Sequence, residues 1–145
     1  MVKVSELIKD RTHVFSVCEQ DTVHNAARYL REKAVRAVGV CDNAGALVGV
    51  ISQSDISDKV AAENRCPAWI KVSEIMSQEM VRVSPETGFD QCLHLMERNG
   101  IYHLLVADQE GRFYGMISVQ DLLQAFADDQ KSRADMLEAY IFTNK

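Results

Sequence analysis

Apolar positions along the chain follow two periods, and the order in which those periods occur repeats. In 23–34 and again in 89–96 apolar residues recur at helical spacing, which predicts a helix in each stretch. Asn99-Gly100 supplies a stop for the second helix. Short apolar runs around these helices are typical of strands. The predicted strands are 14–17, 38–41, 47–51, 81–83, 104–107 and 113–117.

Two of the predicted strand pairs are joined by loops of the same design. Asp42-Asn43-Ala44-Gly45 and Asp108-Gln109-Glu110-Gly111 each open on an Asp and close on a Gly. Such loops suit a hairpin turn whose last residue has a positive φ. The strands are apolar on both faces, so we expect helices on one side and further protein on the other.

The clearest pattern is an internal repeat. Gly49-Val50-Ile51-Ser52-Gln53-Ser54-Asp55-Ile56 returns 66 positions later as Gly115-Met116-Ile117-Ser118-Val119-Gln120-Asp121-Leu122. Each copy reads β-α-β-β-α, with the last helix beginning at the Ser. Half the chain alone would bury only a thin core, so the copies are expected to fold as one body. The predicted units are a first repeat at 1–62, a linker at 63–71, a second repeat at 72–128 and a C-terminal helix at 129–145.

Composition narrows the functional classes. The 145 residues are 47% hydrophobic and 26% charged, with a net charge of −5, which is typical of a soluble globular domain. No basic cluster favours nucleic acid, and no apolar stretch is long enough to cross a membrane. With no signal segment at the N-terminus, we expect a cytoplasmic protein. Its four cysteines form no C-x-x-C pair, so we interpret them as small apolar side chains and predict no metal site.

Two segments outside the repeats receive predictions of their own. Trp69, in the linker, is interpreted as a packing lid over the junction of the copies. The tail carries an apolar stripe at Met136, Leu137, Tyr140 and Ile141. We expect this stripe to pack back on the domain or against a second copy.

Together, the repeat and its motifs resemble a known family. A tandem of β-α-β-β-α units, each ending in Gly-x-Ile-Ser-x-x-Asp-Leu/Ile, is similar to a pair of CBS domains (the cystathionine-β-synthase domain module). The resemblance covers about residues 4–127. It implies an α+β fold in which two repeats pack with pseudo-two-fold symmetry, followed by a C-terminal helix. The segment 137–141 (Leu-Glu-Ala-Tyr-Ile) also resembles the end of stand-alone bacterial members. Such pairs usually dimerise, so the resemblance implies a homodimer.

The Ser-x-x-Asp pairs predict chemistry at helix starts. Ser52 and Ser118 stand where a helix N-terminus favours a phosphate, and Asp55 and Asp121 offer two acceptor oxygens that suit the hydroxyls of a ribose. The resemblance implies adenosine-containing effectors: AMP, ADP, ATP, S-adenosylmethionine or NAD-type dinucleotides. The alternative is that each pair only caps its helix, and the two roles are compatible.

The resemblance also implies contacts from elsewhere in each copy. Arg36 and His103 stand where a basic residue often reaches the ligand phosphate across the pair; a histidine there makes the site sensitive to pH. The base is expected in an apolar slot made by Phe15 and Val17, or by Val81 and Val83. Other positions depart from the family pattern. Ser54 replaces a frequent Arg and Tyr102 a frequent basic residue, which relatively favours a singly charged or zwitterionic ligand.

No catalytic set is visible, so we do not expect an enzyme or an obligatory cofactor. The sequence has neither a P-loop nor a Gly-x-Ser-x-Gly elbow. The first hypothesis is a regulatory sensor that binds an adenosine-containing ligand between its repeats and alters a dimer or an unidentified protein partner. The alternative is a dimeric interaction module whose ligand sites are vestigial.

Overall fold

A computed structural model describes residues 2–143, and the side chains within it up to residue 139. In copy one, the elements are α1 (Val4–Ile8), β1 (Ser16–Cys18), α2 (Val23–Lys33), β2 (Ala37–Cys41), β3 (Leu47–Ser52), α3 (Gln53–Ile56) and the π-helical turn Ser57–Ala61. A short 3-10 turn, Pro67–Trp69, leads into copy two. There, the elements are α4 (Val72–Ile75), β4 (Arg82–Val83), α5 (Phe89–Asn99), β5 (His103–Ala107), β6 (Phe113–Ser118) and α6 (Val119–Thr143).

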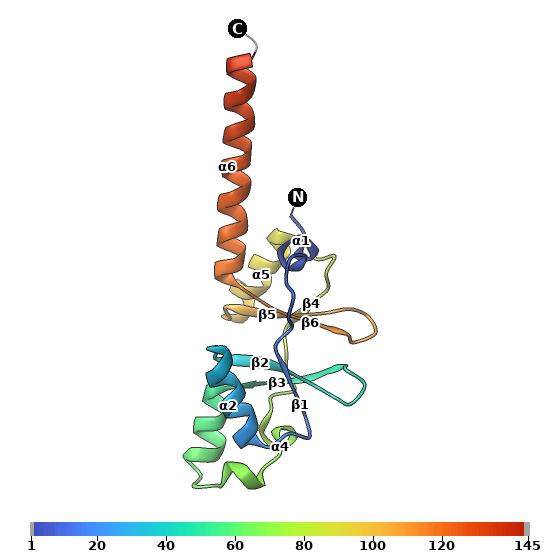
Figure 1. The fold of residues 1–145 in the computed structure, drawn as a ribbon, viewed down its shortest axis with the longest axis vertical. Helices are drawn as coiled ribbons and strands as arrows, with labels where there is room; N and C mark the ends of the chain where they lie inside the picture. The colour runs from blue at the N-terminus through green and yellow to red at the C-terminus, as the bar shows by residue number, and fades with distance from the viewer. Residues whose placement is uncertain (1, 144–145) are drawn as a thin grey trace.

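Each copy builds one three-stranded sheet, in the orders β1-β2-β3 and β4-β5-β6. The first pair in each sheet is parallel and the second antiparallel. The two sheets lie one above the other, as Figure 1 shows. Both hairpins close as the sequence predicts, with Gly45 and Gly111 at φ +84°. The predicted α+β fold with two β-α-β-β-α repeats and a C-terminal helix is therefore confirmed.

Helices α2 and α5, each of 11 residues, end in the same way. The Thr22 side chain accepts a hydrogen bond from the Asn25 N–H at the start of α2, which satisfies one donor that the helix leaves open. At their ends, α2 and α5 both turn into a left-handed residue, Ala34 at φ 55° and Gly100 at φ 62°. Glycine adopts this conformation without strain, whereas alanine does not.

Each copy begins with a short helix that the sequence did not indicate, and that helix packs on the other copy. Val4 of α1 is fully buried in the core of copy two, and its N–H donates to the Thr87 carbonyl over 2.9 Å. Val72 of α4 is fully buried in the core of copy one and donates to the Asp21 carbonyl over 2.8 Å. Because neither core is complete without the other copy's first helix, the halves are built to fold together.

A third, smaller core joins the facing surfaces of the two sheets. It contains Leu47 from copy one and Leu105, Ala107 and Phe113 from copy two. A Cβ on Gly39 would lie 2.5 Å from the Phe113 ring, so the absence of a side chain there lets that ring reach the opposite sheet. The expectation that protein covers both faces of these strands is thus met by the second sheet.

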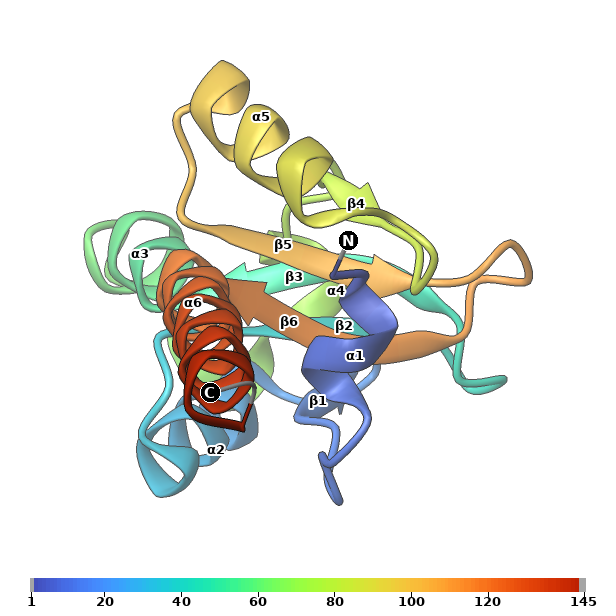
Figure 2. The ribbon, with the colours of Figure 1, turned by 90° about the horizontal axis from the view of Figure 1, so that it is seen from above.

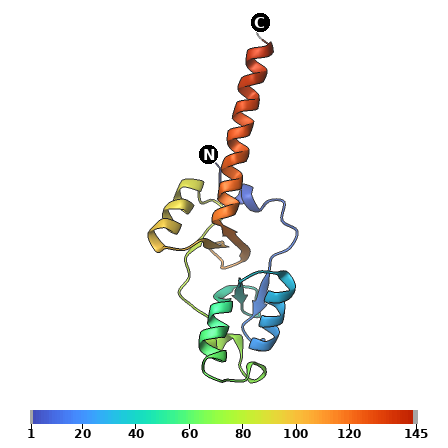
Figure 3. The same ribbon diagram turned by 90° about the vertical axis from the view of Figure 1, so that its left-hand side faces the viewer.

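Two expectations about the periphery are wrong. Trp69 is 86% exposed rather than a lid over the junction. The C-terminal helix is not separate from the second repeat, because α6 runs unbroken from Val119 to Thr143. Asp128-Asp129 carries no helix breaker, so nothing ends the helix there. Side chains at 131–139 are exposed and do not pack back on the domain; Figures 1 and 3 show this part of α6 projecting from the body. The side chains of Tyr140 and Ile141 lie outside the described ones.

Candidate functional site

The largest described cavity, about 670 Å³, lies between the two copies. Copy one contributes the segment 10–15, which leads from α1 to β1, and the turn 34–38 between α2 and β2. Copy two contributes residues of β5, β6 and the start of α6. Figure 2 looks down α6 onto the stacked sheets of the two copies. Its volume is within the usual range of about 300–1,000 Å³ for small-molecule sites.

Ser118 and Asp121 stand at one wall, where β6 passes into α6. Asp121 Oδ2 accepts the Ser118 N–H over 2.8 Å, and Ser118 Oγ accepts the Asp121 N–H over 3.1 Å. This is the reciprocal arrangement of a capping box, so the capping interpretation holds for this pair. The Asp121 side chain is still 41% exposed at the cavity, and a cap leaves its second carboxylate oxygen available as an acceptor.

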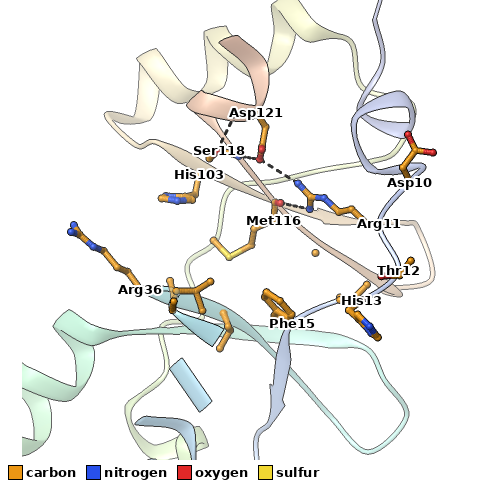
Figure 4. Close-up of a pocket in the computed structure, with 16 residues that line it drawn as sticks. Asp10, Arg11, Thr12, His13, Phe15, Arg36, His103, Met116, Ser118 and Asp121 are labelled. Carbon is orange, nitrogen blue, oxygen red and sulfur yellow. Dashed lines mark hydrogen bonds and ion pairs between the residues drawn. The ribbon is translucent and has the colours of Figure 1, made fainter. Parts of the chain in front are cut away.

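A residue that the sequence did not single out, Arg11, lies against this carboxylate. Its Nη2 is 3.2 Å from Asp121 Oδ2, and its Nη1 donates to the Met116 carbonyl (Figure 4). Local patterns could not identify this residue, because it is separated from Asp121 by 110 positions. One signal was present in the sequence: the segment 9–15 carries the cations Lys9 and Arg11, whereas its counterpart 76–81 carries no Lys or Arg.

Arg36 and His103 approach the cavity from opposite copies. Arg36 stands in the turn before β2, and His103 opens β5. Figure 4 shows both side chains on the same side of the cavity as Ser118, away from Arg11. The structure thus brings together Ser118, Asp121, Arg36 and His103, four of the predicted site residues. A phosphate next to Ser118 would therefore have two further polar groups, Arg36 and His103, on the same side of the cavity.

The four residues predicted for the base slot do not all line the cavity. The Phe15 ring lines the cavity and is 38% exposed, with Met116 beside it in Figure 4. Val17 and Val83, in contrast, are each only 6% exposed and belong to the cores of their copies. Val81 is half-buried and packs against the core of copy two. Of this set, only Phe15 lines the described cavity.

The corresponding place in copy one is arranged differently. Ser52 and Asp55 form the same capping box, but the Ser52 hydroxyl also donates to Asp55 Oδ2 over 3.0 Å. Lys59 Nζ lies 3.1 Å from Asp55 Oδ1, so both carboxylate oxygens are engaged. That carboxylate side chain is only 15% exposed. The partners of Asp55 therefore all come from its own turn and helix.

The chain segment that crosses copy one also closes on it. Val50 and Ser77 exchange two backbone hydrogen bonds of 2.9 Å, which attach the segment after α4 to the edge of β3. A Cβ on Gly49 would lie 2.7 Å from Met76 Sδ. In copy two, the segment 10–15 instead passes Gly115 with the side chains of Arg11 and Val14 against the strand. The cavity is therefore open at copy two, although the two copies otherwise share the same arrangement of elements.

Other chemistry is not evident at this site. Among residues 2–139, no three His, Cys, Asp or Glu side chains are placed to hold a metal ion. No helix in the described part of the chain is long and apolar enough to cross a membrane.

Comparison with known sequences and structures agrees with the repeat. The sequence profile of the CBS domain matches residues 4–62 and 72–128. The mitochondrial CBS domain-containing protein CBSX3 of Arabidopsis thaliana is 31% identical over 125 residues. That match covers 83% of this chain, but the chain spans only 60% of the length of that relative. An uncharacterized 17.7 kDa protein of Acidianus ambivalens is 31% identical over 126 residues, covering 87% of this chain and 74% of that protein.

Solved structures show the same architecture. A putative signal-transduction protein with CBS domains from Burkholderia ambifaria superposes with a TM-score of 0.75 at 28% identity, covering 89% of this chain and 96% of the other. The CBS domain pair of protein MJ0100, in complex with 5′-methylthioadenosine and S-adenosyl-L-methionine, has the same fold, with a TM-score of 0.74 at 21% identity and coverage of 89% and 98%. Two profile matches, related sequences and shared architecture together establish that this chain belongs to the CBS-domain family, as a tandem CBS pair.

Proposed function

We propose that this CBS pair is a regulatory module that binds one adenosine-containing ligand per chain, in the cavity at Asp121. The observation that carries the proposal is that one cavity brings together groups suited to the three parts of a nucleotide. These are an exposed carboxylate for a ribose, a hydroxyl flanked by Arg36 and His103 for a phosphate, and the Phe15 ring for a base.

The two Ser-x-x-Asp pairs do not receive equal roles in this proposal. Asp55 already has partners for both oxygens, from Ser52 and Lys59, so a ribose would have to displace them. Asp121 has Oδ1 free of any described partner, and it borders the cavity. We therefore assign ribose binding to Asp121 and helix capping to Asp55.

The class of ligand is supported by chemistry and by a distant relative. AMP, ADP, ATP, S-adenosylmethionine and NAD-type dinucleotides all contain the adenosine unit that the carboxylate and the ring would hold. The MJ0100 CBS pair, which shares this fold, was solved with two adenosyl compounds. Binding would act on a dimer or on another protein through different affinities of two conformations for the ligand.

A thermal-shift panel tests the proposal. Each ligand is added to wild type, Asp121→Asn and Asp55→Asn; the asparagine keeps an acceptor for the cap but loses the charge and the second acceptor. A ligand at about 100 times its dissociation constant should stabilise the wild type by about 2.7 kcal/mol. The shift should persist in Asp55→Asn and disappear in Asp121→Asn. If no ligand stabilises the wild type, the proposal is wrong.

A second candidate function, a dimeric interaction module, is favoured by α6. Exposed residues at spacings of four and three form a line along this helix, which we call the α6 seam: Leu123, Ala127, Gln130, Ala134 and Leu137. This is the spacing of a coiled-coil contact. In a parallel pair, Arg133 of one helix would stand opposite Glu138 of the other, at flanking positions that carry attractive charges. We therefore propose a second copy of this chain as the partner of α6.

A further inference from the structure

The Asp121 carboxylate is already held by a cation from another part of the chain. Arg11 Nη2 lies 3.2 Å from Asp121 Oδ2, and Arg11 Nη1 donates to the Met116 carbonyl. The two side chains are 31% and 41% exposed, so neither is sealed from water. In Figure 4 the guanidinium extends across β6 to the carboxylate, at the wall of the cavity.

The backbone provides a place for this contact. Arg11 follows α1, and its own N–H donates to the Ile8 carbonyl over 3.1 Å. Below the guanidinium lies Gly115, at φ +106°; a Cβ there would stand 3.3 Å from Arg11 Nη1. A glycine in a strand often marks a close approach by another group. The turn after α1, strand β6 and the start of α6 therefore together hold the guanidinium in place.

Copy one shows what this arrangement replaces. There the acid, Asp55, pairs with Lys59 one turn later on its own helix, and Lys59 Nζ also donates to the Ile75 carbonyl. The position equivalent to Lys59 in copy two is Ala125, 66 residues on. Copy two thus lacks a cation at this position of its helix, and the crossing segment from copy one supplies Arg11 instead. A cation held by a crossing segment can leave without disturbing the helix.

A ribose and Arg11 would need the same atom. Two neighbouring hydroxyls bind a carboxylate most fully through both oxygens, yet Asp121 Oδ2 already accepts from the Ser118 N–H and from Arg11. The Ser118 contact belongs to the helix cap, so Arg11 is the partner that can be exchanged. We propose that Arg11 is an internal competitor for the ligand, which must release the carboxylate before a ribose binds fully.

This inference rests on the proposed function and adds a regulatory consequence to it. Arg11 belongs to the segment between α1 and β1, and α1 is packed on copy two. Release of Arg11 by a ligand would remove the contacts of that segment with the Met116 carbonyl and with Asp121. The ligand-free and ligand-bound states would then differ in how the first segment of the chain is held, which is the kind of difference a partner can recognise.

Calorimetric titration of wild type and Arg11→Gln with adenosine and with AMP tests the inference. Adenosine carries the ribose without a phosphate, so it isolates competition at Asp121. Both probes should bind Arg11→Gln about two- to fivefold more tightly, the effect expected when a partly exposed ion pair no longer opposes binding. Arg112→Gln removes the same charge from an exposed site on the second hairpin and should bind both probes like wild type.

Other outcomes separate the inference from the function beneath it. Weaker AMP binding by Arg11→Gln, with adenosine unchanged, would make Arg11 a phosphate ligand and overturn the competition. Equal affinities of the two chains for both probes would overturn it as well. Binding to Arg11→Gln alone would support it. If neither chain binds either probe, the proposed function fails together with this inference. Ligand-free thermal unfolding establishes that each variant is folded.

Discussion

Arg36 is the residue on which recognition of a phosphate should depend most. It is always charged, and its planar guanidinium matches a phosphate better than an imidazole does. Because the side chain is exposed, we expect Arg36→Gln to weaken AMP binding by about three- to tenfold, below the full effect of a charge-assisted hydrogen bond. Adenosine binding should not change. Calorimetry with both ligands checks this, and an equal loss for both would show that Arg36 shapes the cavity rather than contacting the phosphate.

Asp108 gives a second prediction, on stability and pH. Desolvation raises the pKa of this carboxyl, but hydrogen bonds from the Arg112 N–H, the Tyr114 hydroxyl and the Glu110 N–H outweigh it, and the net pKa is lowered. A lowered folded-state pKa gives stability that is present above the unfolded-state pKa and is lost as pH falls through the folded-state value. Wild type should therefore be more stable than Asp108→Asn at neutral pH, and the difference should shrink in acid.

The matched control for Asp108 is Asp42, which opens the hairpin of copy one. Its loop has the same backbone contacts, but Val48 stands where copy two has Tyr114. Melting temperatures of wild type, Asp108→Asn and Asp42→Asn across an acidic pH series measure the effect. A stability difference for Asp108→Asn that does not depend on pH would contradict the proposed role of its charge.

At the residue scale, the sequence indicates side chains whose chemistry is visible locally. Ser118 and Asp121 are found because three positions separate them at a helix start, and the repeat draws attention to both. Arg11 is not found, because its partner is brought close only by the crossing of the two copies. Val17 and Val83 are apolar in a pattern that suits a core and a base slot equally well, and only the fold separates the two.

The ends of α2 and α5 give a prediction at the scale of the element. Both helices end in a left-handed residue, which is Ala34 in copy one and Gly100 in copy two. An L-residue is strained there, whereas glycine is not. We expect Gly100→Ala to lower the free energy of unfolding by about 1 kcal/mol, and Ala34→Gly to raise it by up to about 1 kcal/mol. Urea unfolding of both variants measures this. The same sign of change in both would show that neighbouring contacts, rather than φ, decide stability at these ends.

Elements with a strong local signal were predicted within a residue or two. The hairpins carry Asp and Gly at fixed places, and the two long amphipathic helices carry a stop or a cap. The short helices α1 and α4 were not predicted, since their four or five residues leave no room for a period. Each of these helices packs on the other copy, because the core of that copy is incomplete without it. The continuity of α6 was missed because a pair of acidic residues looks like a helix end but does not break a helix.

At the scale of the whole molecule, α6 predicts how two chains associate. Replacing Leu123 and Leu137 by Gln removes the largest described side chains of the α6 seam, both about 60% exposed (59% and 61%). We expect sedimentation equilibrium to show a dimer for wild type and a monomer, or a weaker dimer, for the double variant. Met136→Gln, another exposed apolar residue on this helix but outside the seam, is the control and should leave the dimer intact. A monomeric wild type would exclude the proposed pairing.

The two copies share one architecture but differ in the contacts of their Ser-x-x-Asp pairs, and the cavity of about 670 Å³ at Asp121 is part of this asymmetry. Copy one is closed by its own lysine and by a crossing segment bonded to β3. Copy two is left open under a crossing segment that reaches it through Arg11. The repeat offers two Ser-x-x-Asp pairs and leaves the number of occupied sites open. The different contacts of Asp55 and Asp121 are the reason for our proposal of one site, at Asp121.

Stoichiometry tests this central claim most directly. Wild type, Asp121→Asn and Asp55→Asn are titrated in a calorimeter with the adenosine-containing ligand that gives the largest thermal shift. We predict one ligand per chain for wild type and for Asp55→Asn, and an affinity at least about tenfold lower for Asp121→Asn. Two ligands per chain, or undiminished binding by Asp121→Asn, would contradict the assignment of the site to the cavity at Asp121.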